Sequence, residues 1–102
     1  MFSVIFEPQF LTDYRNIKKQ HLEISRELTA ALTELKMTGT VPLVYKPHYL
    51  NTPNENYSGY YEFHLADGKF DVLVIYLPHK SKPKIRLIRM GSHHELFQGP
   101  LK

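Results

Sequence analysis

The run Arg86-Leu-Ile-Arg-Met-Gly-Ser-His-His-Glu-Leu-Phe97 begins as a strand and stops at Gly91, and the rest of the predicted fold is organised around it. It carries Arg89, two histidines and a phenylalanine. Arginine is a permanent cation whose planar fork suits phosphate, and histidine exchanges a proton near neutral pH. The run therefore contains two groups that phosphodiester cleavage needs, although adjacent histidines are also common as solvated surface residues.

Two segments before this run predict further strands. Asp71-Val-Leu-Val-Ile-Tyr76 is a near-continuous apolar run of the kind found at the centre of a sheet. Tyr60-Tyr-Glu-Phe-His-Leu65 alternates between two faces, which places Phe63 on the apolar face and His64 on the polar face. Asp67-Gly68 between them is a hairpin signal, so the second half of the chain predicts an antiparallel meander.

The first half of the chain predicts one strand and two helices. Residues 2–6 alternate as a short strand, and Pro8 is well placed to begin a helix. From Gln9 the apolar residues recur with a helical period, and Asp13 falls among the polar residues that point away from this face. A second apolar stripe consists of Ile24, Leu28, Ala31, Leu32 and Leu35, and Gly39 stands where a C-cap glycine would. A strand, a helical hairpin and a meander predict an α+β domain in which two helices pack on one sheet.

Length and composition predict a single domain over residues 1–102. The apolar content of 42% favours a folded globule, and the net charge of +3 is a mild bias toward a polyanionic partner. No cysteine is present, so a disulfide framework and thiol catalysis are excluded. The opening residues resemble neither a signal peptide nor a membrane span, and we expect a cytoplasmic protein without membrane contact.

The predicted meander brings distant polar residues toward one sheet surface. His64, Asp71 and Arg89 lie on or beside its strands, and His48 precedes the first of them. Together with His93 they form a candidate site for RNA cleavage, in which a base removes the 2'-hydroxyl proton and an acid protonates the departing 5'-oxygen. Taken singly, His48 and His64 are equally consistent with hydrogen-bonded structural histidines, and Asp71 with the cap of a hairpin.

Other chemistries find little support in the sequence. Neither His-Glu-x-x-His nor paired Cys/His spacing occurs, and neighbouring His93 and His94 cannot readily offer both rings to one ion, so we expect no metal. A Gly-rich phosphate loop and a nucleophile elbow are absent as well, and we expect no cofactor. Tyrosines interleaved with basic residues suit either base stacking on single-stranded RNA or an ordinary core rim. The polar loop Asn51–Asn56 favours turns and is expected not to pack.

Four segments carry a resemblance to a known family and together span nearly the entire chain. They are Arg89-Met-Gly-Ser-His93-His-Glu-Leu-Phe97, Tyr45-Lys-Pro-His48-x-Leu50, Tyr60-x-Glu62-x-His64 and Asp71-Val-Leu-Val-Ile-Tyr76. This set resembles the YafQ branch of the RelE bacterial toxins. The resemblance implies the RelE-like microbial RNase fold and a ribosome-dependent mRNA endonuclease of a type II toxin-antitoxin module. It also implies a DinJ-like antitoxin that holds the toxin inactive, with ribosome and mRNA as further partners.

The resemblance also implies roles for individual residues. His93 matches the general acid of the family, Arg89 the arginine on the scissile phosphate, and Phe97 the residue that orients the mRNA base. His48 and His64 match two further active-site histidines.

The aspartate of the family stands immediately before the apolar strand, which here is Asp71, with Asp67 as the second choice. The general base stays open between Asp71, His48 and His64. His94 and Glu95 fall at positions that the family pattern leaves free, and we expect them to be dispensable.

The chain also departs from the family pattern. The usual Gly-x-Trp stretch and an arginine three residues before the histidine are missing, and Tyr57 and Tyr61 stand in that region. Basic residues of the neighbouring turn are expected to compensate by binding the substrate, with Lys84 and Arg86 foremost.

Two other functions remain open at this point. ParE-type relatives have the same fold but inhibit DNA gyrase and lack the histidine-rich site. A non-catalytic RNA-binding module would keep the basic surface and lose the acid-base geometry.

Overall fold

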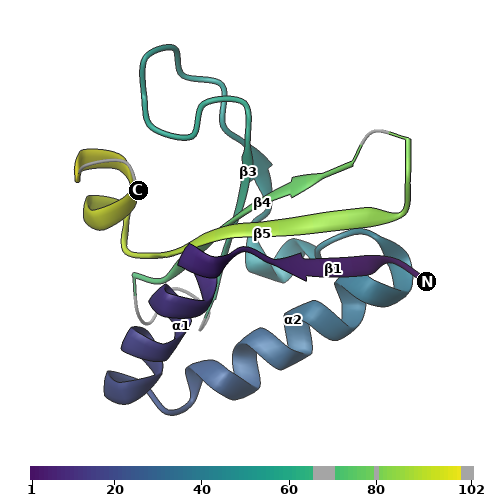
Figure 1. Cartoon of the computed structure of the whole chain (residues 1–102), viewed down its shortest axis with the longest axis horizontal. Helices are drawn as coiled ribbons and strands as arrows, with labels where there is room; N and C mark the ends of the chain where they lie inside the picture. The colour runs from purple at the N-terminus through teal and green to yellow at the C-terminus, as the bar shows by residue number, and fades with distance from the viewer. Residues whose placement is uncertain (66–70, 80, 100–102) are drawn as a thin grey trace.

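The computed structural model describes residues 1–65, 71–79 and 81–99 of the chain (Figure 1). The elements in order are β1 (Ser3–Phe6), α1 (Pro8–Gln20), α2 (Ile24–Thr38), the 3₁₀ turn η1 (Leu43–Tyr45), β2 (His48–Tyr49), β3 (Tyr61–His64), β4 (Leu73–Pro78), β5 (Lys84–Gly91) and the short π-helix η3 (His94–Gln98). This succession confirms the predicted α+β class, with a strand, a helical hairpin and then a series of strands. The turn predicted at Asp67-Gly68 lies outside the described residues.

The strands form one five-stranded sheet in the order β1-β5-β4-β3-β2. Strands β2 to β5 are antiparallel neighbours, which confirms the predicted meander, whereas β1 pairs with β5 in parallel at the far edge. The apolar strand β4 lies in the middle of the sheet and is paired on both sides, as its composition predicted.

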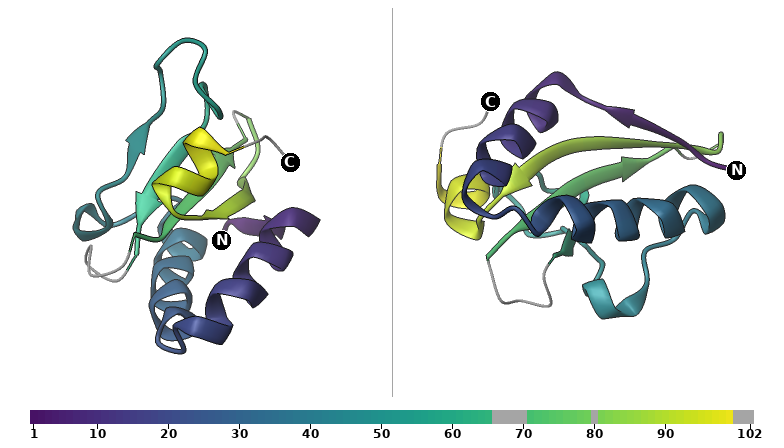
Figure 2. Two further views of the ribbon diagram at one scale, coloured as in Figure 1. Left: turned by 90° about the vertical axis from the view of Figure 1, so that its left-hand side faces the viewer. Right: turned by 90° about the horizontal axis from the view of Figure 1, so that it is seen from below.

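Both helices cover the same face of the sheet (Figure 2). The main core lies between them and the strands, and its fully buried members include Phe10, Ile24, Leu35, Phe63 and Leu87. Phe63 points into this core, and its neighbour His64 lies on the opposite face, as the alternation of this strand predicted. Within the described part of the chain, neither helix has the length and apolar character that crossing a membrane requires.

The opposite face of the sheet carries a second, smaller cluster. Leu73, Ile75 and Leu96 form its buried centre, and residues from the loop before β3 and from η3 pack around it. The side-chain amide of Asn56 donates hydrogen bonds to the carbonyls of Leu96 and Gly99, both at 3.0 Å. The expectation that Asn51–Asn56 does not pack is therefore wrong at its last residue, because this amide satisfies backbone acceptors of the C-terminal segment.

The helix boundaries follow the predicted local signals. Helix α1 begins at Pro8, where the missing N–H of proline costs no hydrogen bond. Helix α2 ends at Gly39, whose φ of 75° lies in the left-handed region that favours glycine. A Cβ atom at this position would lie 2.3 Å from the ring of Phe2, so the glycine also allows the N-terminal segment to pack against the helix end.

A bulge in β5 decides which way Arg89 points. Ile75 of β4 pairs with Arg89 and the next residue, Tyr76, pairs with Leu87, so Ile88 is an extra residue in β5. Without the extra residue, Arg89 would share a face with Leu87 and enter the main core. The bulge instead places Arg89 beside Ile75, on the face that carries the smaller cluster.

Arg89 forms a buried ion pair with Asp13 of α1. Its Nε donates to one carboxylate oxygen at 2.6 Å and its Nη2 to the other at 3.2 Å, and the backbone N–H of Met90 also donates to this carboxylate. Burial disfavours the charge of Arg89, but the hydrogen bonds that it donates to Asp13 and to the hydroxyl of Tyr57 outweigh this effect and raise the pKa of Arg89. The expectation that Asp13 points away with the polar residues of its helix is wrong. Strand β1 pairs with β5 only as far as Leu87, and Asp13 instead binds the backbone N–H of Met90 further along β5.

We expect the substitution Asp13→Asn to destabilise the fold by about 3–5 kcal/mol, because it leaves the charge of Arg89 buried without a counter-ion. The measurement is the free energy of unfolding from urea titration. Glu7→Gln is the matched control, since Glu7 pairs with Arg86 at the surface and exposed pairs contribute less than about 1 kcal/mol. Equal losses in the two variants would contradict a structural role for the Asp13–Arg89 pair.

Candidate active site

The register of the sheet places four residues in one row across four strands. His48 pairs with Glu62, Glu62 with Ile75, and Ile75 with Arg89. Cross-strand partners share a face, so this row lies on the side of the sheet away from the helices. His64 follows Glu62 by two positions on β3 and therefore projects from the same face.

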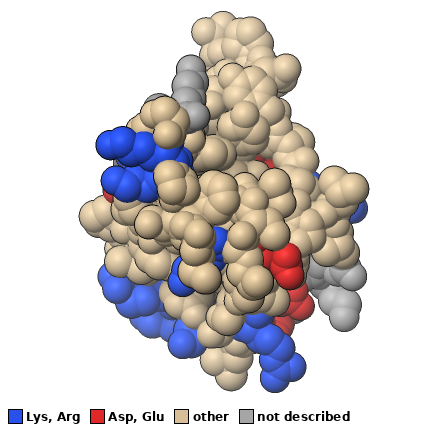
Figure 3. Space-filling model, turned by 90° about the vertical axis from the view of Figure 1, so that its right-hand side faces the viewer, with Lys and Arg blue, Asp and Glu red and all other residues tan. Residues whose placement is uncertain are grey.

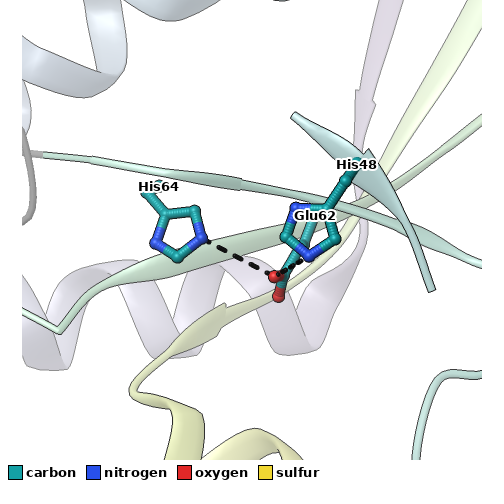
Figure 4. Close-up of side chains that lie close together, drawn as sticks. All are labelled: His48, Glu62 and His64. Carbon is teal, nitrogen blue, oxygen red and sulfur yellow. Dashed lines mark ion pairs between the residues drawn. The ribbon is translucent and has the colours of Figure 1, made fainter. Parts of the chain in front are cut away.

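Glu62 lies between His48 and His64. Its Oε1 atom is 2.6 Å from Nε2 of His48 and 3.6 Å from Nε2 of His64 (Figure 4). The residue is 2% exposed, which is unusual for a carboxylate and requires that charged or hydrogen-bonding partners compensate its burial. Sequence reasoning gave Glu62 no role, although its position two residues before His64 on an alternating strand was a signal that the two share a face.

His93 is held by Asp71. The Nδ1 atom of His93 lies 2.7 Å from one oxygen of Asp71, and its backbone N–H donates to the other at 3.1 Å. Since an ionised carboxylate only accepts hydrogen bonds, Nδ1 carries the proton in this pair and Nε2 is left for chemistry. The two residues meet because each lies two positions beyond the paired residues Leu73 and Gly91.

The rings of four predicted site residues form a second, continuous row. We call this set of His48, His64, His93 and Phe97 the histidine row. Ring centroids are 6.0 Å apart for His48 and His64, 5.6 Å for His64 and His93, and 5.9 Å for His93 and Phe97. The structure thus brings together His48, His64, His93, Phe97 and Asp71 from four different segments of the chain.

A pocket of about 370 Å³ opens beside this row. It is lined by His48, Glu62, His93 and Phe97, and on its other side by loop residues that include Thr52 and Glu55. A larger hollow of about 740 Å³ lies along α2 around Leu22 and Arg26, but histidine and aromatic side chains are missing from its lining. Its size alone therefore does not make it a site for acid-base chemistry.

Three of the predicted cations do not reach this pocket. Arg89 is 5% exposed and directs three of its N–H groups to Asp13 and Tyr57. Arg86 pairs with Glu7, and together with Lys84 it lines a separate hollow near the far end of β5. The separation follows from strand geometry, since each residue of an extended strand adds about 3.3 Å and both positions come well before Gly91. Asp67 lies outside the described residues.

The electrostatic environment of His64 points to a cation that sequence reasoning missed. Partial burial lowers the pKa of His64; Glu62 opposes the shift, and the positive charges of His93, His48 and Lys46 add to it. Lys46 is exposed and close enough to His64 to influence its charge. No strand or helix pattern marks Lys46, because it lies in the irregular segment between η1 and β2.

The residues next to His93 have local partners. Ser92 and Glu95 exchange hydrogen bonds between side chain and backbone, at 3.1 Å each, in the manner of a capping box that begins η3. The ring of His94 lies 3.1 Å from the side chain of Gln98, and His94 is not among the residues that line the pocket. The expectation that His94 and Glu95 are dispensable for chemistry stays a prediction.

Comparisons with known proteins agree with this arrangement. A sequence comparison with curated proteins gives no significant match. The structure is similar to the metal-bound toxin from Helicobacter pylori, with a TM-score of 0.76 and 26% identity over 95% of this chain and 100% of that one. It is also similar to the E. coli DinJ-YafQ complex, with a TM-score of 0.71 and 28% identity over 94% of this chain and 98% of that one. The YoeB-YefM complex from Staphylococcus aureus, at 17% identity and a TM-score of 0.65, has the same fold over 91% of this chain and 98% of that one.

The family model that matches covers almost the whole sequence. It describes the bacterial toxin of type II toxin-antitoxin system, YafQ, and it matches residues 3–98. The matched range contains all five strands, both long helices and every residue of the histidine row. The chain therefore belongs to the YafQ family of type II toxins, whose fold is that of the RelE superfamily.

Proposed function

We propose that this toxin is a ribosome-dependent endoribonuclease that cuts mRNA without a metal ion and thereby stops translation. The observation that carries the proposal is the continuous row of rings from His48 through His64 and His93 to Phe97 beside one pocket. In the reaction the 2'-oxygen attacks the adjacent phosphorus, the bond to the 5'-oxygen breaks, and a 2',3'-cyclic phosphate forms. The proton of the 2'-hydroxyl goes to a base, and the departing 5'-oxygen receives a proton from an acid.

His93 is the general acid in this mechanism. Asp71 binds its Nδ1 and its backbone N–H, so the ring is fixed with Nε2 free to donate. A carboxylate on Nδ1 also stabilises the protonated ring, which must exist before the proton is passed on. Asp71 is then a positioning residue, because both of its oxygens are engaged with His93.

The general base comes from the other end of the row. With Asp71 engaged by His93, the remaining candidates are His48 and His64, which both approach the carboxylate of Glu62. The buried charge of Glu62 favours a proton on the ring beside it, which is the state that the base reaches after attack. Phe97 stacks on or orients a base of the message next to the scissile phosphate.

We assign contact with the phosphate to Lys46, since Arg89 is engaged inside the protein. Lys46 is exposed and lies near His64, whereas the N–H groups of Arg89 bind Asp13 and Tyr57. Figure 3 shows one face of the molecule, on which lysine and arginine side chains gather in separate groups instead of one continuous stripe. Lys84 and Arg86 are expected to bind phosphates further along the message. We propose that the ribosome positions the message, because cleavage requires that the scissile bond be held in one geometry beside the acid and the base.

An antitoxin is the expected protein partner. Members of the family occur in type II modules, and the E. coli relative was solved as the DinJ-YafQ complex. We propose that a DinJ-like protein binds this chain and keeps it inactive in the cytoplasm. An exposed surface with basic groups is a natural target for an acidic or amphipathic segment.

We expect His93→Gln to reduce mRNA cleavage on the ribosome by about 10²–10⁴-fold, the usual contribution of a general acid. The measurement is primer extension on messages translated in a purified system, with single-turnover rates. His94→Gln is the matched control, because the ring of His94 contacts Gln98 and does not line the pocket. This variant is expected to cut mRNA like the unmodified chain.

Equal activity of the two variants would remove His93 from the mechanism. Strong cleavage of RNA without ribosomes would point to an independent ribonuclease. Absence of any cleavage by the unmodified chain would favour a gyrase-inhibiting or a non-catalytic RNA-binding toxin.

We expect the ring of His64 to titrate below its ordinary pKa of 6.5 in the folded, metal-free chain. Glu62→Gln removes the negative charge that holds the pKa of His64 up, so it should lower this pKa further. His93→Gln removes a neighbour that lowers the pKa of His64, so it should raise it. Because the unfolded chain takes up this proton at a higher pH, His64 makes the fold less stable as the pH falls from about 6.5 toward the lowered value. Imidazole NMR signals followed over pH measure each shift, and shifts of opposite sign would contradict the assignment.

We expect Lys46→Gln to lower kcat/KM for ribosome-bound message by about tenfold, which corresponds to the loss of one charge-assisted contact to phosphate. Lys36→Gln in α2 removes the same charge far from the pocket and is expected to have little effect. The comparison is made at several salt concentrations, since a phosphate contact weakens as salt rises. Indistinguishable rates for the two variants would assign the phosphate to another cation.

A further inference from the structure

Three tyrosines form a ladder across one edge of the sheet. Tyr49 of β2 pairs with Tyr61 of β3, and Tyr61 pairs with Tyr76 of β4. Ring centroids are 5.1 Å apart for Tyr49 and Tyr61 and 5.7 Å apart for Tyr61 and Tyr76. Because side chains alternate along a strand, Tyr49 points away from the face that carries its neighbour His48. We call these three residues the tyrosine ladder.

The tyrosine ladder runs from the main core to the surface. Tyr76 is 6% exposed and Tyr61 packs against the core, whereas Tyr49 is 50% exposed. Strand β2 is the edge of the described sheet and has only two residues, so the sheet ends at Tyr49. The sequence suited either base stacking or a core rim, and the structure makes the inner two tyrosines a core rim and leaves the outer ring in contact with solvent.

A pocket of about 320 Å³ lies beside the tyrosine ladder, which is large enough for a flat aromatic ligand. The ladder forms one part of its lining, and the loop after α2 forms another through Gly39, Thr40 and Val41. Pro47 and Pro78 add apolar surface, and carboxylate side chains are missing from the lining that the structure describes. Aromatic and apolar walls without negative charge suit the face of a nucleobase.

The inner end of the ladder has an unused hydrogen-bond donor. The hydroxyl of Tyr76 makes no hydrogen bond to a residue that the structure describes, although a tyrosine as buried as this one usually has a partner. Burial and the neighbouring Tyr61 raise the pKa of Tyr76 to about 12, so its hydroxyl keeps the proton at neutral pH. Tyr76 lines the pocket, and the edges of nucleobases carry nitrogen and oxygen acceptors.

This pocket lies directly across β2 from the proposed catalytic pocket. His48 and Tyr49 line both pockets, and their side chains point to opposite faces of the same strand. Lys46, to which we assign a phosphate, is exposed and precedes this strand by two residues. A single-stranded message that crosses the sheet edge at β2 can therefore place one base beside the histidine row, a phosphate near Lys46 and a flanking base against Tyr49.

We propose that the tyrosine ladder and the loop after α2 form a second base-binding site, in which a nucleobase of the message that flanks the cut stacks on Tyr49. This role rests on the endoribonuclease function proposed above, because bases held on both faces of the sheet edge would fix the scissile phosphate between them. Every base can stack, but the larger ring system of a purine covers more of an aromatic side chain than a pyrimidine does. The site is therefore expected to favour a purine at one position beside the cut.

Binding of an RNA that cannot be cut tests the site apart from cleavage. A short single-stranded oligonucleotide with 2'-O-methyl groups has no 2'-hydroxyl to attack, and NMR titration measures its affinity for the chain. We expect Tyr49→Leu to weaken binding by about tenfold, because the stacked base loses its aromatic partner, and Tyr49→Phe to bind like the unmodified chain. Phe6→Leu is the matched control, since Phe6 is 38% exposed on β1 at the opposite edge of the sheet. Thermal unfolding of each variant shows whether the fold is retained.

A double-mutant cycle identifies the base that Tyr49 contacts. Each nucleotide of the oligonucleotide is replaced in turn by an abasic one, and at one position this loss and Tyr49→Leu should not add, because both remove the same contact. The base site is overturned if the unmodified chain does not bind the oligonucleotide or if the two losses add at every position. It is also overturned if Tyr49→Leu weakens binding of the antitoxin and leaves RNA binding unchanged, which would assign the ladder to the protein partner.

The effect on cleavage is measured separately on ribosomes. Messages that differ only at the position found by the cycle should be cut roughly three- to tenfold faster with a purine than with a pyrimidine, and Tyr49→Leu should lose this preference. The same preference in Tyr49→Leu and in the unmodified chain would overturn the role in cleavage. If the unmodified chain never cleaves, the proposed nuclease function fails, while the binding cycle still decides the base site.

Discussion

The buried pair between Asp13 and Arg89 is the constraint on which the rest of the structure depends. It joins helix α1 to strand β5, and through the hydroxyl of Tyr57 it also holds the loop before β3. A charge removed from water is tolerated only with a partner of good geometry, so this contact fixes the relative positions of three segments. The bulge at Ile88 makes the pair possible, because it turns Arg89 out of the main core. Of the segments that the pair joins, the loop before β3 also lines the pocket, through residues that include Thr52 and Glu55.

The proposed catalytic side chains depend on backbone pairing in the same way. The register sets His48 against Glu62 and brings Asp71 and His93 together just beyond the pair Leu73–Gly91. Each histidine therefore has a carboxylate beside it, one buried at Glu62 and one half-exposed at Asp71. This difference separates the two ends of the row chemically. A fixed ring beside a half-exposed carboxylate suits proton donation to the leaving group, and a pair of rings around a buried carboxylate suits proton uptake.

In the proposed mechanism the cations have different roles from those that the family resemblance implies. The arginine of the motif is bound inside the protein by Asp13, whereas the charge of Lys46 acts on His64. Lys46 follows a short 3₁₀ turn and has a left-handed backbone at φ 51°. An arginine that binds two carboxylate oxygens and a tyrosine hydroxyl has little capacity left for a phosphate. This arrangement places chemical control in neighbouring side chains more than in the histidines alone.

Local pattern in the sequence determined the elements of this protein and the sheet face on which His64 lies. Alternation identified β3 and the side on which His64 lies, apolar composition identified β4 as the central strand, and Pro8 and Gly39 marked helix ends, because each of these signals acts over a few neighbouring residues. Only the tertiary structure decided the partners. The burial of Asp13, the pairing of Glu62 with His48 and the direction of Arg89 all depend on strand register and on one bulge. Register is a relation between distant segments, and a shift of a single residue reverses the face of every side chain that follows.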